Sequence, residues 1–502
     1  MAKSKKSANW KIYIPLLLFF GILILGAFLR LYRINEYMTF LGDEGRDVLV
    51  VKRMIVDHKL TLLGPITSVG AMYMGPIYYY MMAPFLFLWG LNPVGPAVMV
   101  ALFSIATIYL LFRTGNDFFN PFTGVVASFL YAISPLTITY GRSSWNPNVV
   151  PFFALLIIYG LLKIIIKREN RWLTVVALSL GILLQLHYVT FMFLPIILAC
   201  LFLIRFRIPL KYYIYSVLGF LLTYSPFVLF ELRHSFVNTK AVFRFLVEEQ
   251  HVHNVPFIIS FWNTVSDVFV RLFWRLVVIS DADLTKIFIL FLAVLIYFYW
   301  NHVRMKKEQK ASISVIGIWF ITGIIAFGIY RGVIYDYYFG SLFAVPFLIT
   351  GIAFSIIWQQ RYIGKIAVVL VIIALSFFNF QKNPLLIPPN NMLKNTEDVS
   401  RFVYKIADGK PYNFALIALR NSDQAYRYFL EVWGRPPKVI ETPSVDPARK
   451  TVTNSLIVVC EDKVCNPLGN PLWEIAGFGR AEIVKEWKVV TVRVFLLKHY
   501  QG

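Results

Sequence analysis

Long apolar runs recur along this chain, and short polar segments separate them. An α-helix rises about 1.5 Å per residue, so about 20 apolar residues cross the hydrocarbon core of a bilayer. We count roughly eleven runs of this kind. They cover residues 12–30, 96–112, 123–139, 150–166, 174–188, 191–204, 213–230, 286–300, 313–330, 340–358 and 366–380. The pattern predicts an α-helical polytopic membrane protein.

A long loop, residues 31–92, separates the first two runs. Within it, Val48 and Val51 belong to an apolar stripe at helical spacing over residues 44–57, which predicts an amphipathic helix on the membrane surface. Residues 76–89 form a second apolar piece. Counting it as a span would invert every later loop, so we expect an interfacial or re-entrant juxtamembrane helix there.

The composition becomes hydrophilic after the last apolar run, where a proline-rich linker begins. Residues 1–383 are therefore predicted to form the transmembrane domain, and residues 384–502 a small soluble α/β domain. In this second domain we expect helices that start at Thr396 and Ser422, and strands over residues 414–419, 455–460 and 489–497.

The composition supports a membrane protein and excludes a soluble globular enzyme. Hydrophobic residues make up 58% of the chain and charged residues only 15%. The 49 Lys and Arg residues exceed the 27 Asp and Glu residues and give a formal net charge of +22. Cytoplasmic loops and lipid phosphates explain this excess better than nucleic acid does, so we predict no nucleic-acid partner.

The basic residues also predict the orientation of the chain. The N-terminus is basic and lacks a small-residue cleavage site after its apolar run, so we expect a retained first span with a cytoplasmic N-terminus. Basic clusters at residues 167–171, 205–211, 304–310 and 361–365 then fall on the cytoplasmic side. We therefore expect a multi-pass protein of the cell membrane whose C-terminal domain is extracytoplasmic.

Three cysteines are too few for a disulfide framework. Cys200 lies in an apolar run, where we expect it to pack as a small hydrophobic residue. Cys460 and Cys465 lie in the hydrophilic domain, at a spacing that a disulfide across a turn can bridge. The sequence leaves open whether they are bonded.

The residues Gly42-Asp43-Glu44-Gly45-Arg46-Asp47 place three carboxylates at the start of the expected helix. One interpretation is structural, because Asp43 and Glu44 at a helix start favour the N-terminal end of the helix dipole. The other is catalytic, with one carboxylate acting as a general base toward an acceptor hydroxyl beside a membrane-borne substrate. The spacing alone leaves both open.

Several segments together resemble a known superfamily. A basic N-terminus and one span precede an external loop that opens with Asp43-Glu44 and has Arg46 two residues on, and Gly75-Pro76-Ile77-Tyr78-Tyr79 follows downstream. Residues 127–142 and 335–346 match further. This combination resembles the GT-C superfamily of glycosyltransferases, in the branch of protein O-mannosyltransferases and lipid A aminoarabinose transferases. The resemblance covers roughly the first 380 residues.

The resemblance implies that Asp43 is the catalytic base, with Glu44 beside it, and that the donor is a sugar on a polyprenyl phosphate. No glycine-rich phosphate loop is present in the sequence, as expected for such a donor. Tyr73-Met74-Gly75 stands where family members often carry a lysine, so a lysine that grips phosphate must come from elsewhere. Asparagines replace an acid of some members in residues 142–148, so we predict no metal and no other cofactor.

Other polar residues at the outer ends of spans are candidate substrate contacts. Arg46 lies beside the acidic pair, and Arg142 suits a lipid phosphate, although it could equally anchor the span at the lipid headgroups. His187 and Tyr188 could contact phosphate or sugar or be structural, and Arg331, Tyr335 and Asp336 could bind sugar hydroxyls or belong to an aromatic belt. Four residues resemble metal ligands in type, but we do not expect a metal site there: Glu248, Glu249, His251 and His253.

The sequence thus predicts a membrane glycosyltransferase. Its donor would be a polyprenyl-phosphate sugar, and its acceptor a glycan, lipid or protein at the outer face of the cytoplasmic membrane. The alternative is a polytopic transporter or lipid flippase. Against this, the ionisable residues cluster at the outer ends of spans, and the chain does not divide into two matching halves.

Overall fold

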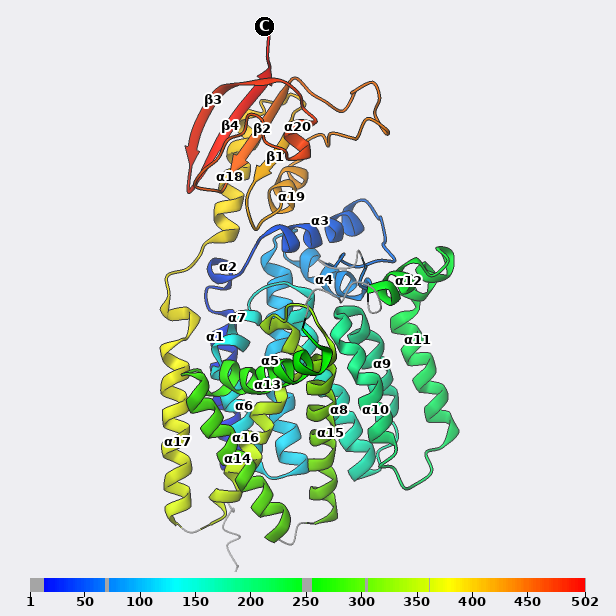
Figure 1. Ribbon diagram of the computed structural model, residues 1–502, viewed down its shortest axis with the longest axis vertical. Helices are drawn as coiled ribbons and strands as arrows, with labels where there is room; N and C mark the ends of the chain where they lie inside the picture. Colours follow the sequence, from blue (N-terminus) through cyan, green and yellow to red (C-terminus); the bar gives the residue numbers. More distant parts are fainter. Residues whose placement is uncertain (1–12, 68–71, 246–254, 303–305, 361, 502) are drawn as a thin grey trace, which may run out of the picture. The chain divides into compact units, whose positions relative to one another are not determined.

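The computed structural model describes residues 13–67, 72–245, 255–302, 306–360 and 362–501. The chain divides into two compact units (Figure 1). The first holds Met1–Tyr32, Thr61–Met81 and Val98–Pro388, and the second holds Arg33–Leu60, Met82–Ala97 and Pro389–Gly502. The second unit thus combines the C-terminal segment with two pieces of the long first loop. The boundary after residue 383 stays a prediction.

The first unit is helical, as the apolar runs predict, because only intrahelical hydrogen bonds can satisfy the backbone of a single segment in lipid. Most of its long helices run nearly parallel in Figure 1, and α13 lies across them. Its helices are α1 (Ile14–Leu31), α6 (Pro121–Ile133), α7 (Pro135–Tyr140), η2 (Asn146–Val149), α8 (Val150–Lys167), α9 (Trp172–Leu186), η3 (Tyr188–Met192), α10 (Phe193–Leu201), α11 (Leu210–Arg233), α12 (Val237–Arg244), α13 (Phe257–Phe273), η5 (Trp274–Val278), α14 (Ala282–His302), α15 (Lys307–Ile329), η6 (Asp336–Leu342), α16 (Ala344–Trp358), α17 (Tyr362–Gln381) and η7 (Pro384–Leu386). Two more helices, α4 (Ile77–Leu88) and α5 (Val94–Phe118), run from one unit into the other.

Within the described residues, six helices are long and apolar enough to cross a membrane, or up to seven if the bent pair η6 and α16 counts as one span. All eleven predicted runs are largely helical, but fewer are single long helices. One reason is Pro135, which separates α6 from α7. Another is the 55° bend between η6 and α16. The expected short helix in residues 76–89 is confirmed as α4.

The core of the first unit comes from packing between neighbouring helices. α9 packs against both α8 and α11, and α6 packs against α1 and α16. α11 and α17 present many exposed apolar side chains, which suits contact with lipid tails. The predicted loop between the spans at 213–230 and 286–300 contains two helices that were not expected, α12 and α13, and α13 packs against α15.

The second unit is built on a four-stranded sheet of order β1-β2-β4-β3. Only β1 and β2 are parallel. Its elements are α2 (Ile34–Tyr37), α3 (Gly42–Val56), α18 (Met392–Ile406), β1 (Asn413–Ile417), α19 (Gln424–Val432), β2 (Ser455–Cys460), α20 (Trp473–Ala476), β3 (Ala481–Val489) and β4 (Val492–His499). Residues of α18 and α19 pack on one face of the sheet, and residues of α20 pack on the other.

Most elements expected in the C-terminal domain are confirmed, with three corrections. α19 begins at Gln424 and not at Ser422, because Asn421 Oδ1 binds the backbone N of Ser422 and Asp423 is the residue that precedes the helix. Thr396 lies inside α18 and does not start it, because Asn390 Oδ1 accepts a hydrogen bond from Met392 N at 2.9 Å and the helix begins at Met392. Strand β3 was not expected, because its alternation is weak and most of its side chains are exposed. Cys460 and Cys465 are joined by a disulfide, and Cys200 is free and buried.

The helix predicted over residues 44–57 is confirmed as α3. One face of α3 packs against α19 of the same unit, so this face is not available to a membrane surface. Gly45 allows this close packing, since a Cβ there would lie 2.3 Å from the Cα of Ala425.

Candidate functional site

The helix α3 begins at the acidic sequence that the sequence analysis singled out. Leu41 is extended and precedes the helix, and its backbone N donates to Glu44 Oε2 at 3.0 Å. Glu44 is buried, with 6% of its surface exposed. Burial raises the pKa of Glu44 to about 7, although the backbone N–H donors of Leu41 and of Glu44 itself oppose this effect. Glu44 therefore stabilises the start of the helix from the inside.

Asp43 lies in a different environment from its neighbour. Its side chain is 53% exposed, and Arg46 Nη1 donates to its Oδ1 at 2.9 Å. Arg46 also binds the buried carboxylate of Asp47, with Nη2 at 2.8 Å from Oδ1. Asp43 is thus the carboxylate of this segment that faces solvent, and it lies in the first turn of α3, where the helix dipole favours a negative charge.

Arg142 is only 2% exposed and lies inside the first unit. Its Nη1 donates to Leu29 O at 2.7 Å and its Nη2 to Tyr32 O at 2.6 Å. Arg30 is buried near it and donates to Ser104 Oγ at 2.6 Å and Ala132 O at 3.0 Å. The two arginines therefore hold the end of α1 by hydrogen bonds to backbone carbonyls and a hydroxyl.

His187 and Tyr188 follow α9 and point to different partners. The ring of His187 lies 4.8 Å from that of Tyr338, and its Nδ1 accepts from Val189 N at 3.2 Å. Tyr188 donates its hydroxyl to Tyr73 O at 2.5 Å and accepts from Asn238 Nδ2 at 2.7 Å. His187 thus joins a group of aromatic rings, whereas Tyr188 joins α12 to the segment before α4.

Tyr335 and Asp336 lie in the same aromatic region as His187. The rings of Tyr335 and Tyr337 stack with centroids 5.7 Å apart, and Tyr335 is 55% exposed. Asp336 Oδ2 accepts from Arg275 Nε at 2.8 Å. Arg331 Nη2 donates a hydrogen bond to Val255 O at 2.8 Å.

Arg271 and Arg275 are candidate site residues that the sequence analysis missed. Arg271 Nε lies 3.5 Å from Asp336 Oδ1, and its guanidinium lies over the ring of Phe339 at 4.7 Å. The two arginines are four residues apart, so they share one face of the segment formed by α13 and η5. The amphipathic pattern of residues 257–275 is the signal that could have revealed them.

The described residues contain no group of three or more His, Cys, Asp or Glu side chains that could hold a metal ion. The four residues that resemble metal ligands in type lie outside the described residues: Glu248, Glu249, His251 and His253. Asn146 and Asn148, in the loop where some GT-C proteins carry an acid, donate to Leu186 O and Ser143 O at 2.6 and 2.8 Å.

The fold is that of the GT-C glycosyltransferases, and the protein is a multi-pass membrane protein. The structure is similar to ArnT from Cupriavidus metallidurans bound to undecaprenyl phosphate, with a TM-score of 0.63, 12% sequence identity, and coverage of 97% of this chain and 98% of that chain. It is also similar to the oligosaccharyltransferase AglB from Archaeoglobus fulgidus in complex with an inhibitory peptide and a dolichol-phosphate, with a TM-score of 0.55, 12% identity, and coverage of 90% of this chain and 70% of that chain.

The sequence comparison agrees with this fold. A profile of the dolichyl-phosphate-mannose-protein mannosyltransferase family matches residues 74–230. A comparison with curated protein sequences finds no match. The family profile and the solved structures confirm the resemblance to GT-C glycosyltransferases that the motifs indicated.

Proposed function

We propose that this protein transfers a sugar from a polyprenyl-phosphate donor to an acceptor on the outer side of the cytoplasmic membrane. The GT-C fold supports the class of reaction, and two of the similar structures hold undecaprenyl phosphate and dolichol-phosphate. The single observation that carries the proposal is the exposed Asp43 in the first turn of α3, because a general base must reach solvent or substrate.

The proposed chemistry is a direct displacement at the anomeric carbon. An acceptor hydroxyl or amine attacks this carbon and inverts it, the bond to the lipid phosphate oxygen breaks, and the polyprenyl phosphate leaves with the bonding electrons. Asp43 takes the proton of the attacking group. Glu44 supports Asp43 by holding the helix start, and Arg46 orients the Asp43 carboxylate through their ion pair. The leaving phosphate needs no acid, because it is already a stable anion.

The leaving phosphate is stabilised by a cation in this proposal. Both terminal nitrogens of Arg142 already donate to carbonyls, so we assign Arg142 to holding the end of α1. Arg275 is a better candidate, because its side chain is 46% exposed while its Nε binds Asp336. Guanidinium nitrogens that remain accessible match phosphate oxygens in pairs.

The aromatic group around Tyr335 is the proposed contact surface for sugar. The stacked rings of Tyr335 and Tyr337 present apolar faces, and Asp336 and His187 supply hydrogen-bonding groups beside them. Tyr188 and Arg331 both donate hydrogen bonds to backbone carbonyls. They remain proposed substrate contacts only because of the chemical type of their side chains.

The proposed function implies an orientation of the protein in the membrane. The N-terminus faces the cytoplasm and the C-terminal segment faces the outside, because the basic clusters then fall inside. Arg304 and Arg361 of these clusters lie outside the described residues.

The acceptor is a glycan, lipid or protein, and transfer proceeds without a metal. One similar structure, the Archaeoglobus fulgidus oligosaccharyltransferase, was solved in complex with Zn and sulfate, so transfer with and without EDTA is the direct check.

The test is incubation of the purified protein with radiolabelled polyprenyl-phosphate sugars and a membrane lipid extract. We expect label to move to an acceptor in the parent protein. In Asp43→Asn, the rate should fall by about 10² to 10⁴-fold while donor binding stays near normal, as for loss of a general base. Movement of unchanged donor across vesicles, without release of polyprenyl phosphate, would support a flippase. Near-parent turnover in a folded Asp43→Asn protein would remove Asp43 from the mechanism.

A further inference from the structure

The backbone next to Asp43 is bound by a side chain that is distant in sequence but lies in the same unit. Gly42 N donates to Asn421 Oδ1 at 2.8 Å, and Ser422 N donates to the same oxygen at 2.9 Å. Asn421 lies in the loop between β1 and α19. One amide oxygen thus joins the first residue of α3, directly before Asp43, to the segment that leads into α19.

The orientation of the Asn421 amide is fixed by Glu461. Asn421 Nδ2 lies 2.9 and 3.1 Å from the two carboxylate oxygens of Glu461, and the Tyr426 hydroxyl donates to Glu461 Oε1 at 2.6 Å. An ionised carboxylate only accepts hydrogen bonds, so it must face the NH₂ group of the amide. The amide oxygen is therefore turned toward Gly42.

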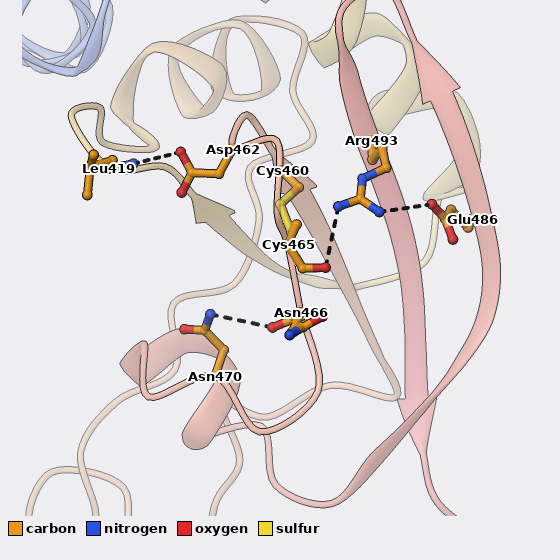
Figure 2. The surroundings of a disulfide bond; sticks show 8 residues. All are labelled: Leu419, Cys460, Asp462, Cys465, Asn466, Asn470, Glu486 and Arg493. Atoms are coloured by element: carbon orange, nitrogen blue, oxygen red, sulfur yellow. Dashed lines mark hydrogen bonds and ion pairs between the residues drawn. A yellow bond between two sulfur atoms is a disulfide. The ribbon is translucent and has the colours of Figure 1, made fainter.

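The segment that carries Glu461 is itself held to the sheet. Glu461 N donates to Ile417 O at 3.0 Å at the end of β1. The disulfide between Cys460 and Cys465 closes the turn that follows, as Figure 2 shows. In the same turn, Asp462 Oδ1 accepts from Leu419 N at 3.1 Å. Glu461 therefore lies in a turn that is joined to β1 by hydrogen bonds and to the end of β2 by the disulfide.

The contact between Gly42 and this loop is close. A Cβ on Gly42 would lie 2.9 Å from the backbone N of Ser422, so the backbone of α3 approaches the loop closely at a glycine. At the other end of α3, Lys52 and Arg53 form ion pairs with Glu431 of α19, at 3.3 and 2.7 Å. The helix that carries Asp43 is therefore fixed at both ends by the C-terminal segment.

We propose that Asn421 and Glu461 are positioning residues for Asp43, so that the C-terminal segment sets the geometry of the catalytic base. This inference rests on the proposed role of Asp43. Asn421 acts through the hydrogen bond to Gly42, and Glu461 acts by orienting the Asn421 amide. Loss of either lets the start of α3 move, and small misplacements of a catalytic group can lower a rate by about 10²-fold.

The first test compares Asn421→Ala with Glu431→Gln in the full-length protein. Both variants weaken the contact between α3 and the C-terminal segment, but only Asn421→Ala frees the end next to Asp43. With the radiolabelled polyprenyl-phosphate sugar that the parent turns over, kcat should fall roughly 10- to 100-fold in Asn421→Ala while the donor KM stays within about twofold. Glu431→Gln should keep a kcat near that of the parent. Equal losses of kcat in the two variants would overturn the proposal and indicate general destabilisation.

The second test exchanges the chemistry of the pair. Asn421→Asp alone removes the Nδ2 donor to Glu461 and places two carboxylates about 3 Å apart. Their repulsion turns the introduced side chain away from Gly42 N, so kcat should fall. Adding Glu461→Gln restores one carboxylate and one amide in reversed order, with the introduced carboxylate accepting from Gly42 N. The double variant should recover most of the lost kcat. A double variant that is no better than Asn421→Asp would contradict the orienting role of Glu461.

A third measurement separates this inference from the proposed function. Hydrogen exchange of the peptide that contains Gly42 reports the hydrogen bond without any substrate, and it should be faster in Asn421→Ala than in the parent or in Glu431→Gln. If Asp43→Asn keeps near-parent turnover, the proposed function fails whatever Asn421 does. If Asp43→Asn is impaired while Asn421→Ala exchanges faster and turns over normally, only the positioning role fails.

In the Asp43→Asn background, Asn421→Ala should lower kcat no further, because it acts through Asp43.

Discussion

Asp43 and Glu44 are adjacent in the sequence but differ in their burial and in their hydrogen-bond partners. Glu44 turns inward and accepts from Leu41 N, whereas Asp43 turns outward to Arg46. The sequence indicated both a helix start and a possible base; in the structure Glu44 bonds to the backbone at the helix start, and Asp43 is the proposed base. The pattern could not assign them, because residues one apart on a helix point about 100° from each other and only packing decides which direction is inside.

The buried Glu44 makes the stability of the protein depend on pH. Its folded pKa of about 7 lies above the ordinary value of 4.5, so its contribution to stability is fully present below pH 4.5 and is lost as the pH rises through 7. The difference corresponds to on the order of 3 kcal/mol. Glu44→Gln can still accept from Leu41 N but does not titrate. Between pH 5 and pH 8, thermal unfolding of the parent should lose more stability than that of Glu44→Gln, and equal slopes would contradict the buried charge.

Arg142 is the residue for which the structure changes the interpretation most. A guanidinium at the outer end of a span suggested a phosphate contact, but its donors reach Leu29 O and Tyr32 O. We expect Arg142→Ala to lower the free energy of unfolding by about 1–3 kcal/mol, since buried carbonyls lose their donors. Arg142→Lys should recover only part, because one ammonium cannot replace two separated donors. Donor titrations of the folded variants are the check: a large rise in donor KM at unchanged stability would return Arg142 to the phosphate site.

At the scale of elements, the apolar and alternating patterns predicted most of the chain. The buried strand β2 was predicted with its observed bounds, and α3, α4 and α19 were predicted within a few residues. Two of the missed elements, α13 and β3, have mixed polar and apolar faces. Their patterns resemble surface segments, because each buries only part of its surface.

The contact between α3 and α19 gives a prediction at this scale. Replacing glycine by alanine inside a helix usually stabilises the helix by about 1 kcal/mol. Gly45→Ala should instead destabilise the protein by about 1–3 kcal/mol, because the new Cβ would lie 2.3 Å from the backbone of Ala425, which cannot yield cheaply. Val56→Ala, at an exposed position near the end of α3, is the matched control and should change the melting temperature little. A more stable Gly45→Ala protein would mean that the two helices do not pack this closely.

At the scale of the whole molecule, the orientation in the membrane is testable by cysteine labelling. The native cysteines are suitable as a background, because Cys200 is buried and Cys460 and Cys465 are bonded. Single cysteines at Asn35 and Arg420 should react with an impermeant reagent from outside. A cysteine at Lys307 should react only after permeabilisation. Labelling of Arg420→Cys only after permeabilisation would show that the number of spans between the termini differs by an odd number from the proposed count.

The sequence by itself determined that this chain is a helical membrane protein with a small α/β segment, and it indicated the acidic start of α3 as a candidate site. These features are local, since apolar length, helical spacing and strand alternation are written in consecutive residues. The tertiary structure alone decided that Asp43 faces solvent, that Arg142 turns inward, and that Asn421 binds Gly42. That last contact joins residues 379 positions apart. Local periodicity carries no information about such a pair, because its partners meet only when the sheet, α19 and α3 have packed together.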